Sequence, residues 1–124
     1  MKLATLNNGS RDGQLVVVSK DLTRYTTTDI PTLQFALDNW DTATPALQAA
    51  YQQLNEDKSV GESFDPEKCY SPLPRAYQWA DGSAYLNHVE LVRKARNAEV
   101  PESFYSDPLM YQGGSDSFIG PRAC

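Results

Sequence analysis

This sequence contains few of the residues that cross-link small proteins. Its 124 residues include two cysteines, Cys69 and Cys124, and one histidine, His88. Two cysteines, one of them the last residue, do not make a disulfide framework. Because disulfides are rare in the cytosol, the low cysteine content predicts a reduced, cytoplasmic protein.

Long hydrophobic runs and an excess of basic charge are also missing. No run approaches the roughly 20 apolar residues of a membrane span, and the start, MKLATLNNGSRDG, turns polar too early for a secretory signal. The chain has 11 Lys and Arg against 16 Asp and Glu, a formal charge of -5. Nucleic acids and anionic membranes both attract a basic face, so we expect neither as a partner.

The beginning of the chain has the pattern of an antiparallel sheet. KLATL alternates, QLVVVS is a β-branched run, and LTRYTTT suits a half-exposed strand. The turn formers of NNGSRDG separate the first two of these segments. The sequence therefore predicts a three-stranded meander over residues 2–27.

Two helices are predicted after the meander, over residues 31–40 and 45–55. Asp29 is the expected cap of the first, with Pro31 near its first position. Pro45 is expected to end the first helical segment, because proline lacks an amide hydrogen and clashes with the preceding turn. The expected core-facing residues are Leu33, Leu37 and Trp40 in the first helix and Leu47, Tyr51 and Leu54 in the second.

The second half of the chain is less regular. Residues 56–75 are polar and contain three prolines, which is typical of a connector. A short strand and a helix follow, with Asp81 or Ser83 as the expected cap. The tail is rich in loop formers, with a strand expected only at residues 116–120. Its apolar residues need a surface to pack against, so we expect a larger second domain and a chain that stops early.

Asp81 and His88 are the most chemically distinctive pair, and two interpretations of them remain open. If one helix carries both, they lie on the same face about 10 Å apart. In the first interpretation Asp81 caps the helix and His88 is structural. In the second they hold opposite ends of a substrate, with the carboxylate on a hard ion such as Mg²⁺, Mn²⁺ or Ca²⁺ and the imidazole as the base for water.

The sequence around this pair resembles the fumarylacetoacetate hydrolase family. Residues 81–88, DGSAYLNH, are similar to the D-F-x-x-F-x-x-H segment of that family, and DPLMYQGGSDSFIGPR looks like the stretch that follows it in bacterial members. The opening residues are similar to the small N-terminal domain of those proteins. The resemblance covers nearly the whole chain in family order. It departs at Gly82, where the family has an aromatic residue.

The resemblance implies roles for four residues and a reaction. Asp81 matches the first carboxylate ligand of a divalent cation, and His88 matches the base that activates water. Arg96 and Tyr111 match substrate-binding positions. Members of the family are homodimers that hydrolyse a carbon–carbon bond of diketo-acid substrates such as fumarylacetoacetate, in aromatic amino-acid catabolism. The cation, Mg²⁺, Mn²⁺ or Ca²⁺, polarises the carbonyl and stabilises the departing carbanion as an enolate.

The same resemblance implies an α+β fold in two parts. Residues 1–73 are expected to form an N-terminal domain, a small antiparallel sheet with two helices. Residues 74–124 are expected to be the incomplete start of a mainly β catalytic domain. The family's further metal ligands, a Glu-x-Glu pair and a later Asp, have no counterpart in this sequence. One carboxylate is a poor Mg²⁺ site, so we expect the 124-residue chain alone to be inactive.

Two other function classes remain open. The chain could be a non-enzymatic interaction module that uses its apolar tail to dimerise or to bind a full-length partner. It could also belong to an isomerase or a decarboxylase, since enzymes acting on related keto acids share the scaffold. A module would be an oligomer that is indifferent to divalent ions and to the replacement of His88.

Overall fold

The computed structural model describes residues 1–82, 85–107 and 110–122 and divides the chain into two compact units. The first unit comprises residues 1–76 together with the segment that begins at Asp116, and the second comprises residues 77–115. About 34% of the chain is helical and 17% is in strands, and the fold class is α+β, as predicted. The domain boundary expected after residue 73 stays a prediction.

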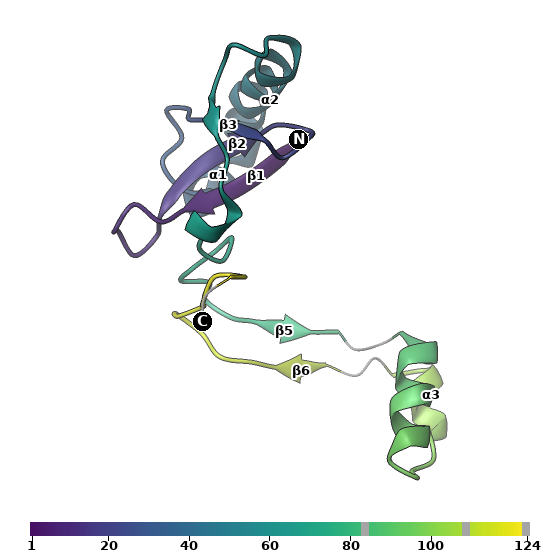
Figure 1. The fold of residues 1–124 in the computed structure, drawn as a ribbon. Coiled ribbons are helices and arrows are strands. Elements are labelled where there is room, and N and C mark those ends of the chain that lie inside the picture. The colour runs from purple at the N-terminus through teal and green to yellow at the C-terminus, as the bar shows by residue number, and fades with distance from the viewer. Residues whose placement is uncertain (83–84, 108–109, 123–124) are drawn as a thin grey trace. The chain divides into compact units, whose positions relative to one another are not determined.

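A four-stranded antiparallel sheet forms the centre of the first unit (Figure 1). The sheet order is β1-β2-β3-β4, with β1 at Lys2–Leu6, β2 at Gln14–Val18, β3 at Arg24–Thr26 and β4 at Glu62–Ser63. The predicted meander is confirmed. The strand β4 was not predicted, because its two residues lie in a polar connector and pair only with β3.

Two helices pack against this sheet, α1 at Leu33–Asp38 and α2 at Trp40–Glu56. The cap of α1 is Thr32, whose hydroxyl accepts a hydrogen bond from the Phe35 amide at 3.1 Å, so the expected Asp29 cap is wrong. The predicted break at Pro45 is also wrong, because α2 continues through it. The proline removes one backbone hydrogen bond from α2, while buried residues on both sides of it hold the helix against the sheet.

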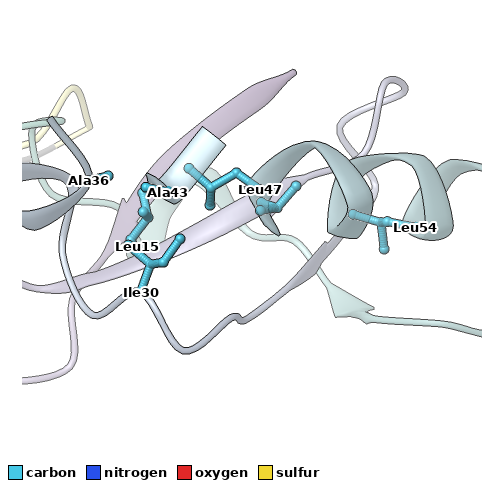
Figure 2. Close-up of a cluster of buried hydrophobic side chains, with 7 residues drawn as sticks. Leu15, Ile30, Ala36, Ala43, Leu47 and Leu54 are labelled. Atoms are coloured by element: carbon cyan, nitrogen blue, oxygen red, sulfur yellow. The ribbon is translucent and has the colours of Figure 1, made fainter. Parts of the chain in front are cut away.

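The hydrophobic core lies between β2 and the two helices (Figure 2). Its buried members are Leu15, Val17, Ile30, Ala36, Ala43, Leu47 and Leu54. The expected stripe of α2 is confirmed, with Tyr51 partly buried beside Leu47 and Leu54. The stripe expected in the first helix is only partly right: Leu33 packs on the core, but Leu37 of α1 and Trp40 at the start of α2 are 46% and 42% exposed. Ala36 occupies the buried position of this short helix instead.

The connector and the end of the chain meet at the edge of the sheet beside β1. After the short helix η1 (Pro66–Lys68), the Tyr70 amide donates to the Thr5 carbonyl at 2.9 Å. The returning segment donates from the amides of Asp116 and Phe118 to carbonyls of residues 76 and 74. No strand forms over residues 116–120, all of which the structure describes, so that prediction is wrong.

The second unit contains a small hairpin and one helix. Strand β5 (Ala80–Asp81) pairs with β6 (Tyr111–Gln112), and α3 covers Leu86–Ala95, with the short helix η2 at Glu102–Tyr105. Within the described residues of this unit, Val89 and Phe104 are the buried hydrophobic side chains. Among the helices that the structure describes, none has the length and apolar character needed to cross a membrane.

Candidate functional site

Two of the four predicted site residues meet across the β5–β6 hairpin. The antiparallel register places Asp81 directly opposite Tyr111 and Ala80 opposite Gln112. Directly opposite residues project from the same face of a strand pair, with Cβ atoms about 5 Å apart. The carboxylate and the phenol are therefore neighbours, although 30 residues separate them in the sequence.

An aromatic residue that the sequence analysis did not select belongs to the same hairpin. The Trp79 ring contacts the Tyr111 ring edge to face, with centroids 6.0 Å apart and planes at 76°. The backbone pairing continues beyond the strands, because the Gly113 amide donates to the Trp79 carbonyl at 2.8 Å. Trp79 precedes Asp81 by two residues, which is the spacing of one strand face, so recognising β5 as a strand would have found it.

Helix α3 lies at one end of the hairpin (Figure 1); it carries His88, and Arg96 follows its last residue. His88 is exposed, whereas its neighbour Val89 is buried in the core of the unit. Arg96 is the C-cap residue of α3, and its amide donates to the carbonyls of the last turn. With Arg93 and Lys94 it places positive charge where a helix dipole favours cations.

The proposed arrangement of Asp81 and His88 on one helical face is wrong. Helix α3 begins at Leu86 after an extended Tyr85, and Asp81 lies in β5. The expected Asp81 cap is therefore wrong as well, while the alternative cap, Ser83, lies outside the described residues. The 10 Å spacing does not apply, because Asp81 lies in a strand and only His88 lies on the helix. The catalytic and metal-binding roles assigned to them stay predictions.

The described residues do not assemble a metal site by themselves. Across residues 1–82, 85–107 and 110–122, no group of three or more histidine, cysteine, aspartate or glutamate side chains could hold an ion. In the second unit Glu90 instead accepts a hydrogen bond from the Tyr105 hydroxyl at 3.4 Å. A divalent cation at Asp81 would thus need ligands beyond those described.

Ionisable groups with shifted pKa values lie in the first unit. Hydrogen bonds from Ser19 and Thr23 lower the pKa of Asp21 to about 2. A hydrogen bond from Arg75 lowers the pKa of Asp12, and burial raises the pKa of the Cys69 thiol. Each of these shifts has a local structural cause, and none of the three groups is a predicted site residue.

A cavity of about 340 Å³ lies between the connector and the returning end of the chain, in the first unit. Cys69, Tyr70 and Phe118 are among its lining residues. None of the four predicted site residues lines it, so the cavity and the hairpin are separate features of the chain.

Comparison with known proteins identifies the first unit. The family model described as fumarylacetoacetase N-terminal domain 2 matches residues 1–75, which is more than half of the chain. No curated protein matches the chain. The matched range contains the four-stranded sheet with α1 and α2, and it ends just before the unit that carries Asp81, His88, Arg96 and Tyr111.

Proposed function

This chain belongs to the fumarylacetoacetate hydrolase family, with its N-terminal domain at residues 1–75, and from that premise we propose that its second unit contributes to a hydrolase site. The reaction would cleave a carbon–carbon bond in acylpyruvates and other 1,3-dicarbonyl substrates such as fumarylacetoacetate. We also propose that the full-length protein is a cytoplasmic homodimer and that it acts in aromatic amino-acid catabolism.

One observation carries most of this proposal: Asp81 and Tyr111, to which the resemblance assigns a metal-ligand and a substrate-binding role, lie opposite each other on one hairpin. Residues paired by chance would not be expected to meet across 30 positions of sequence. The exposure of His88 on α3 adds support, because a base must be reachable by water and substrate.

Each predicted site residue of the second unit has a chemical task in the proposed reaction. His88 would take a proton from the attacking water, as neutral imidazoles do near pH 7. Arg96 would bind the carboxylate of the diketo acid, since its planar guanidinium matches that geometry. Tyr111 would hydrogen-bond to a substrate oxygen. The dependence on Mg²⁺, Mn²⁺ or Ca²⁺ expected from the family needs carboxylates in addition to Asp81.

The first prediction concerns His88. It is tested on the full-length product of the gene, with the 124-residue chain measured for comparison. With acetylpyruvate as substrate and Mg²⁺, Mn²⁺ or Ca²⁺ present, the unaltered protein should form acetate and pyruvate. Replacing His88→Gln should lower kcat about 100- to 10,000-fold, the usual contribution of a general base. The 124-residue chain alone should show no turnover.

Asn87→Ala is the matched control, because Asn87 is the exposed neighbour of His88 on the same helix. It should leave kcat unchanged. Circular dichroism spectra that coincide for both variants and the unaltered protein would exclude a loss of fold. Full activity of His88→Gln would remove His88 from the reaction. Failure of the unaltered protein to cleave acetylpyruvate with any of the three ions would contradict the hydrolase proposal.

Exposed aromatic and aliphatic residues favour a second candidate function, an interaction module. The second unit and the returning end expose Tyr77, Tyr85, Leu91, Tyr105, Met110 and Ile119 by 59% or more. Burying apolar surface that is exposed to water is a driving force for association. As the second prediction, a module would sediment as a stable oligomer at micromolar concentration, with or without EDTA. Its mass would not respond to His88→Ala, and a monomer in these conditions would contradict this candidate.

A further inference from the structure

One face of the β5–β6 hairpin carries two aromatic rings beside a carboxylate. Trp79 and Asp81 are two residues apart on one side of the hairpin, and Tyr111 and Gly113 are two residues apart on the other. Since side chains alternate along a strand, each pair shares a face. The register, with Asp81 opposite Tyr111, joins both pairs on the same face.

Gly113 provides the space that the Trp79 ring occupies. A Cβ atom added at Gly113 would lie 2.1 Å from Cε3 of Trp79 and within 3.0 Å of two further ring atoms. Real Cβ contacts are never this short, so any other residue at position 113 would displace the indole. A Cβ atom added at the next residue, Gly114, would meet nothing within 4 Å.

The two rings are held together but remain open to solvent. Trp79 is 43% exposed and Tyr111 is 65% exposed, although their edge-to-face contact fixes the planes at 76°. Aromatic pairs prefer this edge-to-face geometry, so the contact favours one orientation of the tyrosine ring. The pair thus presents ordered apolar surface next to Asp81.

We propose that Trp79 is a positioning residue of the candidate site: it orients Tyr111 beside Asp81 and forms the apolar wall for the planar, non-polar part of the substrate. This inference rests on the proposed hydrolase function. A 1,3-dicarbonyl compound is planar in its enol form, and the acetyl group of acetylpyruvate has no polar atoms beyond the carbonyl. An indole ring gives such a group a flat apolar surface, while Asp81 and Tyr111 serve its polar end.

The two glycines supply the test, because Gly113→Ala displaces the Trp79 ring without changing Trp79, Asp81 or Tyr111. Gly114→Ala is the matched control at the adjacent position. In the 124-residue chain, a Trp40→Phe background leaves Trp79 as the sole tryptophan, so its emission maximum there reports whether the ring has moved. The binding of acetylpyruvate to the gene-encoded protein is measured by calorimetry in a His88→Gln background, and KM and kcat are measured with His88 present.

We expect Gly113→Ala to shift the Trp79 emission, to weaken acetylpyruvate binding and to raise KM, the last two by about 3- to 10-fold. The value of kcat should change less than twofold, because the wall binds substrate without touching the reacting atoms. Gly114→Ala should match the unaltered protein in all four measurements. Trp79→Phe should recover part of the loss seen in Trp79→Ala, since a phenyl ring restores part of the wall.

Equal binding and KM for the two glycine variants would overturn the role of Trp79 and leave the hydrolase proposal intact. An unshifted Trp79 emission in Gly113→Ala would also overturn it, because the contact on which it rests would be absent. Weaker binding in Gly113→Ala alone, in a protein without turnover, would support the Trp79 wall and contradict the hydrolase reaction. A protein that neither binds nor cleaves acetylpyruvate would overturn both.

Discussion

At the scale of single residues, Leu22 is the clearest departure from what the sequence favours. Its φ is +63°, a left-handed conformation that glycine adopts readily and leucine does not. Hydrogen bonds around Ser19 hold the turn: its hydroxyl accepts from the amides of Thr23 and Arg24 at 3.2 and 3.0 Å and donates to Asp21 at 2.6 Å. The turn therefore imposes the conformation on Leu22.

Leu22→Gly should accordingly stabilise the protein. Strain of this kind costs about 1–3 kcal/mol, while glycine loses about 0.5–1 kcal/mol through the entropy of the unfolded chain. The side chain is 53% exposed, so little packing is lost. We expect a net gain of about 1 kcal/mol in the free energy of unfolding, measured with urea. Lys20→Gly in the same turn is the control and should destabilise. Equal destabilisation by both changes would show that Leu22 is not strained.

At the scale of elements, local pattern was sufficient for the meander and for the stripe of α2 but not for helix ends. Alternation and β-branching predicted β1 to β3, because neighbouring strands pair through local turns. The end of α2 depends instead on a distant residue. The last turn of α2 has no basic residue, and Arg24 of β3 supplies the charge by donating to the carbonyls of Leu54 and Asp57 at 2.8 and 3.1 Å.

For the candidate site, too, local sequence was sufficient for some features and not for others. The motif around Asp81 and His88 could be read from sequence, but a helical spacing was assumed although Asp81 lies in a strand. Pairing of β5 with β6 decides that conformation, and it joins segments 30 residues apart that have only two strand residues each. Periodicity cannot predict strands this short, so the neighbourhood of Asp81, Tyr111 and Trp79 required the structure.

At the scale of the whole molecule, hydrogen-bonded aspartates of the first unit make its stability depend on pH. The Arg75 guanidinium donates to Asp12 across 63 residues, which ties the connector to the β1–β2 turn. This hydrogen bond lowers the pKa of Asp12, and hydrogen bonds from Ser59 lower the pKa of Asp57. With Asp21, three carboxylates in this unit therefore favour the charged form in the folded state.

The sign of the pH effect follows from these shifts. A carboxyl group whose pKa is lower in the folded than in the unfolded state stabilises the fold above its unfolded value, which is near 3.8, and this contribution is lost as the pH falls. For Asp21, the loss should occur between about pH 4 and pH 2, the pKa to which its hydrogen bonds lower it. The urea midpoint should therefore fall steeply over this interval and change little between pH 5 and 7.

Asp21→Asn tests whether Asp21 causes this loss of stability. An amide keeps an oxygen acceptor for Ser19 and Thr23 but does not titrate over this range. The variant should lose part of the dependence of the urea midpoint on pH between 4 and 2. Asp29→Asn is the control, because no side-chain hydrogen bond of Asp29 is observed among the described residues, and it should keep the slope of the unaltered protein. If Asp21→Asn and the unaltered protein lose stability in parallel down to pH 2, the acid sensitivity of the fold arises from carboxylates other than Asp21.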